Sequence, residues 1–220
     1  MRLYFNSMTC FKSRIISHLL PVILLLFLYG RVSAQQFNAG VIGGLGGTQI
    51  SGDNLSGFDK LGFLAGGYVS SELSPKFDMA GQLLFITKGS KKDQEPEKND
   101  YTTYLLRLQY LELPIVFTWK QSKRFHFEAG PTFGYLLNSY EEDEYGEDPV
   151  SREFNEFEFG FVGSIIINIK EGFAVNFRYN QSLMPVREHS GGATYYLNQG
   201  QYNSGLLLAA QYTFRSKANK

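Results

Sequence analysis

The segments of this chain that have β-strand character are separated by gaps that alternate between long and short. After position 36 there are eight such segments, and the gaps between them lie at roughly 48–60, 74–76, 89–103, 120–123, 138–155, 170–172 and 183–201. A barrel that crosses a bacterial outer membrane has an even number of antiparallel strands, short periplasmic turns and longer extracellular loops. A soluble sandwich has no reason to sort its loops by length onto alternate ends. The spacing therefore predicts an all-β fold, an eight-stranded antiparallel transmembrane β-barrel with up-and-down topology.

The segments themselves alternate bulky apolar residues with small or polar ones. In segment 173–182, one face carries Phe173, Val175, Phe177 and Tyr179. The other face carries Ala174, Asn176, Arg178 and Asn180. The same alternation occurs in segments 77–88, 124–137, 155–169 and 202–214. A period of two over this many residues indicates strands rather than helices.

The size of the apolar side chains decides which face meets lipid. The chain has 19 Phe and 14 Tyr, and most of those in the segments fall on the apolar faces. An eight-stranded barrel has an interior just wide enough for side chains, so aromatic-rich faces would overfill it. We therefore predict that the apolar faces point to lipid and that small and charged residues fill the lumen. The expected structural charge network of the lumen consists of Arg107, Glu128, Glu158 and Arg178.

Two further features bear on the strands. Tyrosines near strand ends are expected to form the aromatic girdles at the membrane interfaces. The candidates are Tyr68, Tyr110, Tyr135, Tyr179 and Tyr212. Pro114 lies inside segment 104–119, where it removes a ladder hydrogen bond and so predicts a bulge or a strand end. Pro131 raises the same question in segment 124–137.

The N-terminus has the pattern of a secretory signal peptide. A basic region is followed by an apolar run of eleven residues at 19–29 and by the small residues Val32-Ser33-Ala34. The apolar run is too short to span a bilayer as a helix. We predict a signal peptide at 1–34 and a barrel domain at 35–220, with an uncleaved anchor as the alternative. Met1 and Met8 are both candidate starts.

Removal of the signal peptide changes the composition of the chain. Cys10, the single cysteine, would leave with it, and so would four of the 21 basic residues and no acidic ones. The mature chain would then carry 17 basic and 21 acidic residues, a net charge of −4. This balance argues against a nucleic-acid partner, because nucleic-acid-binding domains are basic. The absence of cysteine excludes disulfides and thiolate metal sites.

Three segments invite a chemical interpretation, and none predicts a site. Gly43-Gly44-Leu45-Gly46-Gly47 lacks the spacing of a dinucleotide-binding loop. The acidic run at 141–148 lacks the ligand spacing of an EF-hand loop and is more typical of a solvated loop. His126 and His189 are candidates for a lipid-modifying enzyme, but no G-x-S-x-G motif accompanies them. We therefore predict no catalytic, cofactor or metal site.

The most specific pattern of the chain is the run Tyr110-Leu111-Glu112-Leu113-Pro114. It resembles the Y-L-E-L-P signature of the PorT-like outer-membrane β-barrel proteins of the Bacteroidetes. Three further stretches are similar to strands of that family: Ala129-Gly130-Pro131 with Gly134-Tyr135-Leu136-Leu137, the run 177–183 and Tyr212-Thr213-Phe214. Gln181-Ser182 departs from the family by standing where a glycine is usual. The resemblance implies an eight-stranded outer-membrane barrel but no single activity. The founding member of that family is associated with the secretion and gliding apparatus of these bacteria.

Together these features predict a non-enzymatic outer-membrane barrel with both termini in the periplasm and the long loops outside the cell. We expect a scaffold, an adhesion surface or an accessory of an envelope secretion system. The expected partners are outer-membrane lipid, the barrel-assembly machinery during insertion and envelope or secretion-system proteins. A narrow porin-like channel and a lipid-modifying enzyme are the functional alternatives, and a soluble periplasmic barrel is the structural one.

Overall fold

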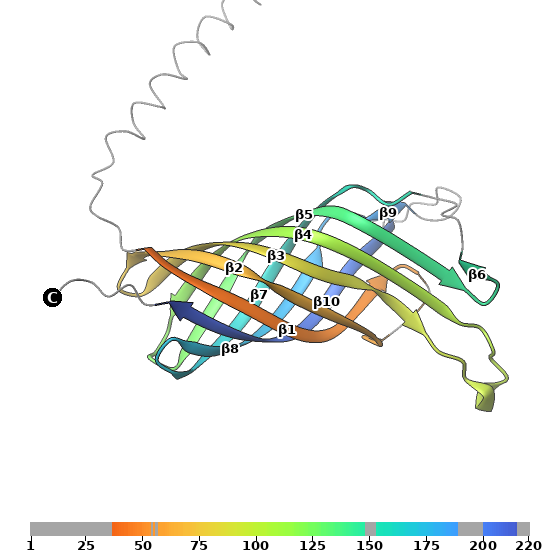
Figure 1. Cartoon of the computed structure of the whole chain (residues 1–220), viewed down its shortest axis with the longest axis horizontal. Helices are drawn as coiled ribbons and strands as arrows, with labels where there is room; N and C mark the ends of the chain where they lie inside the picture. The colour runs from red at the N-terminus through yellow and green to blue at the C-terminus, as the bar shows by residue number, and fades with distance from the viewer. Residues whose placement is uncertain (1–36, 54, 56, 148–152, 189–199, 215–220) are drawn as a thin grey trace, which may run out of the picture. The chain divides into compact units, whose positions relative to one another are not determined.

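The computed structural model describes residues 37–53, 55, 57–147, 153–188 and 200–214. The predicted signal peptide at 1–34 and both candidate start residues lie outside these ranges. Eight long strands and two strands of two residues form one sheet in the described residues (Figure 1). The strands are β1 (Phe37–Ser51), β2 (Lys60–Ser74), β3 (Phe77–Lys92), β4 (Tyr104–Lys120), β5 (Phe125–Asp143), β6 (Gly146–Glu147), β7 (Phe157–Lys170), β8 (Phe173–Ser182), β9 (Arg187–Glu188) and β10 (Gly200–Phe214). A 3₁₀ turn, η1 (Pro96–Lys98), lies between β3 and β4.

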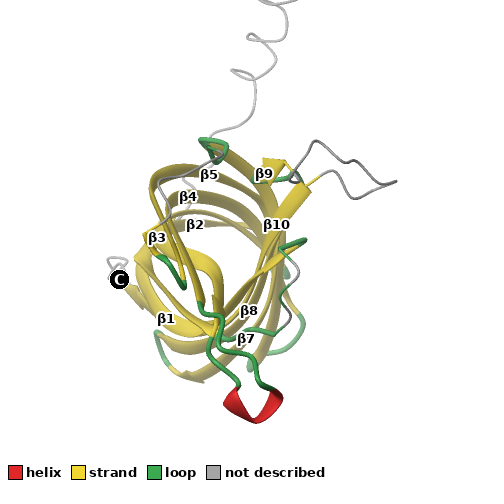
Figure 2. Cartoon of the chain, turned by 90° about the vertical axis from the view of Figure 1, so that its right-hand side faces the viewer, coloured by secondary structure: helices red, strands yellow, loops and turns green. Residues whose placement is uncertain are grey.

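The eight long strands close into a barrel because the first pairs with the last. Each long strand is antiparallel to its neighbour along the chain, in the order β1-β2-β3-β4-β5-β7-β8-β10. The circle is completed by β1 and β10, whose pairing runs from Ala39↔Phe214 to Ser51↔Tyr202. Figure 2 shows the barrel from the end that carries the longer loops. The predicted eight-stranded antiparallel barrel with up-and-down topology is confirmed.

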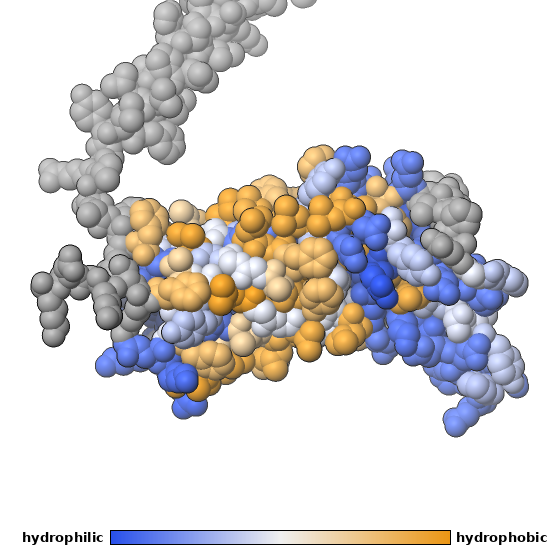
Figure 3. All heavy atoms as spheres, in the orientation of Figure 1, coloured by the Kyte–Doolittle hydropathy of each residue, from blue (hydrophilic) through white to orange (hydrophobic). Residues whose placement is uncertain are grey.

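The outer face of the barrel carries an apolar belt. Outward residues of successive strands are large, apolar and exposed, and Figure 3 shows them as a broad apolar zone between two hydrophilic ends. On β4 the belt runs from Leu111 to Trp119, a span of nine residues. A transmembrane strand needs roughly 9–11 residues, so the belt has the height of a bilayer. In the described residues, no helix is long and apolar enough to cross a membrane.

Three strands continue beyond the belt toward the long loops. β3, β4 and β5 contain 16, 17 and 19 residues, which is more than a membrane crossing requires. The β4–β5 register shifts between Gln109 and Tyr110, so that Leu137 is left without a partner. Such a bulge bends a strand and changes which residues face inward. Beyond Leu137, toward the long loops, Glu141 is therefore buried, although an unbroken alternation along β5 would point it outward like Tyr135.

The prolines do not interrupt their strands as the sequence predicted. Pro114 is buried inside β4, and the β3–β4 register is the same on both sides of it. Only the pairs of Pro114 and its neighbour Leu113 are missing from the ladder, next to the position where proline has no N–H to donate. The β4–β5 ladder has a similar local gap near Pro131, again without a register shift. The prediction of a bulge or strand end at Pro114 is therefore wrong; the bulge lies at Leu137.

The lumen contains more apolar volume than the sequence predicted. Inward residues of β1, β2, β3, β4 and β10 form a buried apolar cluster that includes Leu64, Leu84 and Leu106. Tyr68 and Tyr110 belong to this cluster, which corrects their prediction as girdle residues. Tyr135, Tyr179 and Tyr212 do lie on the outer face. Two of the predicted girdle residues thus fill the lumen instead.

Candidate functional site

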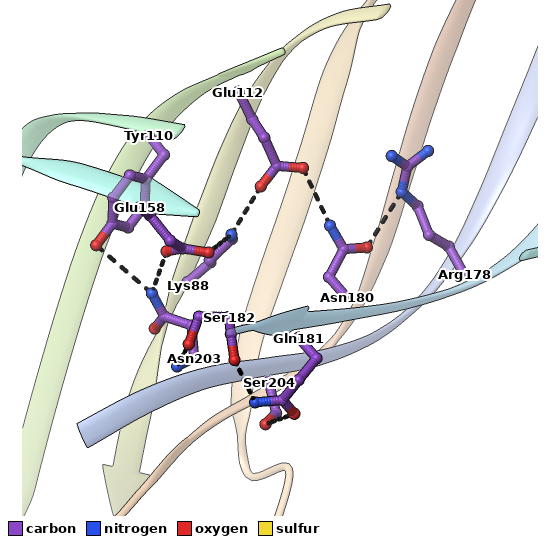
Figure 4. A network of polar contacts seen from close by, with 10 residues as sticks. All are labelled: Lys88, Tyr110, Glu112, Glu158, Arg178, Asn180, Gln181, Ser182, Asn203 and Ser204. Atoms are coloured by element: carbon purple, nitrogen blue, oxygen red, sulfur yellow. Dashed lines mark hydrogen bonds and ion pairs between the residues drawn. The ribbon is translucent and has the colours of Figure 1, made fainter. Parts of the chain in front are cut away.

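A network of buried polar side chains crosses the lumen (Figure 4). At its centre, the Lys88 Nζ donates to Glu112 Oε2 at 2.7 Å and to Glu158 Oε1 at 2.6 Å. All three side chains are at most 4% exposed. Removal of such charges from water is costly unless they are paired and hydrogen-bonded. The single lysine therefore forms ion pairs with two carboxylates that come from different strands, β4 and β7.

The network continues from this centre in two directions. Asn203 Nδ2 on β10 donates to Glu158 Oε2 at 2.6 Å. On the other side, Asn180 Nδ2 on β8 donates to Glu112 Oε1 at 3.1 Å, and its Oδ1 accepts from Arg178 Nε at 3.1 Å. Through these contacts the network joins β4, β7, β8 and β10, while Lys88 adds β3. It fixes opposite walls of the barrel to one another.

A second polar layer lies next to the first, toward the short turns. Arg178 donates from a terminal guanidinium nitrogen to Gln82 Oε1 at 2.8 Å. Gln82 Nε2 in turn lies 3.3 Å from both carboxylate oxygens of Glu128. The same guanidinium nitrogen is 3.8 Å from Glu128 Oε1, which completes a looser ion pair. Arg178 thus links the two layers.

The structure places the predicted network residues unequally. Glu128, Glu158 and Arg178 are buried inside the barrel, with Arg178 only 1% exposed. Arg107 is exposed on the outer face, which corrects its prediction as a lumen residue. On β4, Arg107 points to the same side as Gln109 and Leu111, because Leu106 and Leu108 point inward to the apolar cluster. Arg107 lies beyond the upper edge of the belt, on the side of the long loops.

The side chains of the run 110–114, which resembles the PorT-like signature, point alternately into the lumen and to the outer face. Tyr110, Glu112 and Pro114 face inward, whereas Leu111 and Leu113 belong to the outer belt. Sequence reasoning did not assign Glu112 or Lys88 to the network. The signal was present, since Glu112 stands between two leucines and Lys88 occupies the polar face of its segment. In a barrel strand whose other face is apolar, such charged residues are expected to point into the lumen.

A separate clamp lies at the long-loop end of the barrel. Arg187 on β9 makes a bidentate ion pair with Glu141, at 2.6 and 3.0 Å. Its guanidinium also lies over the Phe154 ring, 4.1 Å from the ring centroid. Burial opposes the charge of Arg187, but the hydrogen bond and charge of Glu141 outweigh it and raise the pKa of Arg187. The clamp holds the end of β9 against the extension of β5.

The short-turn end of the lumen contains a polar cavity of about 270 Å³. Asp78, His126 and Glu128 are among its lining residues. The His126 Nε2 is 3.1 Å from Asn168 Nδ2, so its ring is held by an amide rather than by a carboxylate. His189, the other candidate histidine, lies outside the described residues. In the described part of the chain, no group of three or more His, Cys, Asp or Glu side chains is arranged to hold a metal ion.

From the short turns toward the long loops, the lumen thus contains the polar cavity, then the Arg178–Gln82–Glu128 contacts and then the Lys88 centre. The apolar cluster lines the remaining side, and the Arg187 clamp lies at the long-loop end. The buried carboxylates and Lys88 have hydrogen-bond partners on neighbouring walls, whereas the Arg178 Nη2 has none among the described residues. These contacts favour a closed barrel, because buried charges without partners would be strongly unfavourable.

An apolar belt around a closed, polar-cored antiparallel barrel defines a membrane-spanning β-barrel protein. The model of the outer membrane protein beta-barrel domain family matches residues 33–188, and the chain belongs to this family. It is an outer-membrane β-barrel protein. No match to the chain is found among curated proteins.

Solved structures of transmembrane β-barrels resemble the chain at low sequence identity. Ail, the attachment invasion locus protein of Yersinia pestis, in complex with the heparin analogue sucrose octasulfate, is 10% identical with a TM-score of 0.47. That match covers 81% of this chain and 99% of Ail. Neisserial surface protein A is 8% identical with a TM-score of 0.48, over 81% of this chain and 96% of that protein. A designed transmembrane β-barrel is 11% identical with a TM-score of 0.41, over 80% of this chain and 95% of the design.

Proposed function

We propose that this outer-membrane barrel is a non-enzymatic, non-conducting protein that serves as a scaffold or adhesion surface, or as an accessory of an envelope secretion system. The observation that carries this proposal is the Lys88 centre, where side chains from β3, β4, β7 and β10 meet across the lumen. A solute would have to break these ion pairs to pass. In a closed barrel, the loops and the contacts with neighbouring envelope molecules then carry the function.

Conductance separates the proposal from the porin-like alternative. The purified protein, inserted into a planar lipid bilayer, is expected to give no single-channel steps above the baseline. A variant with Lys88→Ala, Glu112→Ala and Glu158→Ala removes the centre and provides the matched control for a widened lumen. Regular steps from the wild-type protein that the control enlarges would contradict a closed barrel and support a channel.

The orientation of the barrel is part of the proposal. We place both termini and the short turns in the periplasm, with the loops after β1, β3, β5 and β8 outside the cell, because outer-membrane barrels have short periplasmic turns. The predicted mature chain has no cysteine, so single cysteines can report topology. Lys98→Cys in η1 is expected to react with a membrane-impermeant maleimide on intact cells, and Gln121→Cys only after lysis. The reverse pattern would invert the orientation.

Two further aspects of the proposal depend on residues rather than on the fold. The PorT-like assignment is supported by Tyr110-Leu111-Glu112-Leu113-Pro114 and implies a place beside secretion components. Co-purification of an envelope secretion protein with the wild-type barrel would support the accessory role.

The lipid-modifying alternative is disfavoured by the amide partner of His126. Lipid hydrolysis that His126→Ala or His189→Ala abolishes would overturn the non-enzymatic proposal.

A further inference from the structure

The apolar belt is hollowed on the side of the barrel where the first and last strands meet. A groove of about 660 Å³ lies over β1, with walls from β2, β8 and β10. Its bulky outward-facing lining residues are Leu45, Phe63, Val175 and Leu208. Gly43 and Ala210, which pair across the β1–β10 seam, lie between them. In Figure 3, residues of intermediate hydropathy interrupt the apolar zone on the face that carries β1.

The outward glycine in this groove is not explained by packing within the chain. A Cβ added to Gly43 would meet only the Leu64 carbonyl oxygen, at an ordinary contact distance of 3.9 Å. The inward glycines next to it differ sharply. A Cβ on Gly44 would lie 2.5 Å from the Leu208 carbonyl oxygen, and one on Gly46 would lie 2.0 Å from that of Leu206. Gly44 and Gly46 are needed for the fold, whereas Gly43 keeps open a space outside it.

We propose that this groove holds an acyl chain of a membrane lipid at a defined position on the barrel. The groove is continuous with the apolar belt, and the belt is the surface that faces lipid hydrocarbon. All nine of its lining residues are apolar or glycine, so it offers no side chain that would select a polar ligand. A flexible hydrocarbon chain fills such a hollow and gains the dispersion contacts that an empty space would forfeit.

A second copy of the chain is the other occupant to consider, since small residues let membrane proteins approach closely. A symmetric pair would bring the same patch of each copy together. This shallow hollow is lined by the bulky side chains Leu45 and Phe63 beside Gly43, so a symmetric pair would have to bring these side chains of both copies together. An acyl chain fits the hollow without this requirement. The proposal therefore commits to lipid.

Photo-crosslinking tests the proposal directly. The full-length barrel is reconstituted in phosphatidylcholine vesicles that contain a phospholipid with a photoactivatable group in the middle of one acyl chain. Crosslinked peptides are mapped by mass spectrometry. For the wild-type protein we expect enrichment at the β1 and β10 residues that line the groove. Gly43→Leu and Ala210→Leu fill the groove from its two central strands, and each should reduce this crosslinking several-fold.

Gly163→Leu is the matched control. Gly163 is an outward position on β7 that does not line the groove, and a Cβ there would meet only the Phe161 ring, at 3.6 Å. This variant should leave crosslinking at the groove unchanged, and circular dichroism would verify that all three variants fold. Equal crosslinking in the wild type, Gly43→Leu and Ala210→Leu would overturn the proposal. A dimer captured in the same vesicles by a bifunctional protein crosslinker and lost in Gly43→Leu would also overturn it, because it would identify a second copy as the occupant.

Discussion

Lys88 and Glu112 face one another inside the barrel, with 2.7 Å between the Lys88 Nζ and Glu112 Oε2 and almost no exposure of either side chain. They lie on adjacent strands, and Glu158 approaches the same ammonium group from β7 at 2.6 Å. The lysine is therefore the one cation that joins two carboxylates at this level of the described lumen. This arrangement makes the barrel sensitive to the loss of one side chain.

Lys88→Met is expected to destabilise the barrel strongly. The substitution leaves Glu112 and Glu158 buried without their cation, and breaking a buried pair in this way costs about 3–5 kcal/mol. Urea unfolding in lipid vesicles, followed by the fluorescence of Trp119, measures the loss. Lys91→Met is the control, because the Lys91–Asp93 pair is exposed and its loss should cost about 0–1 kcal/mol. Similar losses in the two variants would show that the Lys88 centre is not a stabilising feature.

Substitution of glycine by alanine should change the stability of the barrel in opposite directions on its inner and outer faces. A Cβ on inward Gly66 would lie 2.0 Å from the Leu83 carbonyl oxygen, whereas a Cβ on outward Gly81 would meet nothing within 4 Å. Gly66→Ala should destabilise the barrel by about 1–3 kcal/mol through overpacking. Gly81→Ala should stabilise it by about 0.4–1 kcal/mol, because it restricts the unfolded chain. The same unfolding measurement checks both signs, and a stabilising Gly66→Ala would contradict the described packing.

Trp119 should report the edge of the belt. It is 45% exposed on the outer face of β4 near the short turns and packs beside Phe127, with 5.8 Å between ring centroids. Because aromatic residues at this position lie at the membrane interface, insertion into vesicles should shift its emission to shorter wavelength. Lipids brominated near the headgroup should quench it more than lipids brominated at the chain end. Quenching by aqueous acrylamide that is equal with and without lipid would exclude this placement.

The loop between β3 and β4 provides a pH test outside the membrane. Hydrogen bonds from Lys92 and Thr102 hold the pKa of Asp100 well below its ordinary value. A carboxyl group with a lowered pKa stabilises the folded loop above its ordinary pKa, and this contribution is lost as the pH falls through the lowered pKa. An NMR titration of the Asp100 carboxyl carbon should show the low midpoint, and Lys92→Met should raise it. Lys91→Met, which leaves the Lys92–Asp100 pair intact, should not.

The Arg187 clamp should control the exposure of the chain around β9. Arg187→Met removes both hydrogen bonds to Glu141 and the contact over Phe154. We expect faster proteolytic cleavage near β9, with little change in the unfolding of the barrel, because the clamp lies outside the belt. Lys98→Met, which removes an exposed pair with Glu95, serves as the control. Unchanged cleavage in Arg187→Met would show that the clamp does not hold this segment.

The sequence pattern predicted the barrel well because alternation and loop lengths are local properties. Glu128, Glu158 and Arg178 stand on strand faces whose opposite faces are clearly apolar, so their inward direction could be inferred. Segment 104–119 is apolar on both faces, and its direction is decided by how Leu106 and Leu108 pack with distant strands. This explains why Arg107 was assigned to the wrong side.

The charge centre depends on contacts that local patterns do not encode. Lys88 and Glu158 are 70 residues apart, and their meeting requires the closed barrel and its register. The bulge at Leu137, which turns Glu141 toward Arg187, has no equivalent signal in the sequence. Tyr68 and Tyr110 fit inside because glycines of other strands leave room for their rings: a Cβ on Gly40 would lie 2.3 Å from the Tyr68 ring, and one on Gly134 would lie 3.3 Å from the Tyr110 ring.

The pairing of β1 with β10 has a consequence for the order of folding. One edge of β1 finds its partner only when β10, at the far end of the described chain, has been laid down. Contacts between such distant segments carry a large loop-closure cost and slow the folding of β-rich proteins. The seam should therefore be the last part of the barrel to form. Until it closes, two unpaired strand edges are open to pairing with another chain, a hazard that only completion of the circle removes.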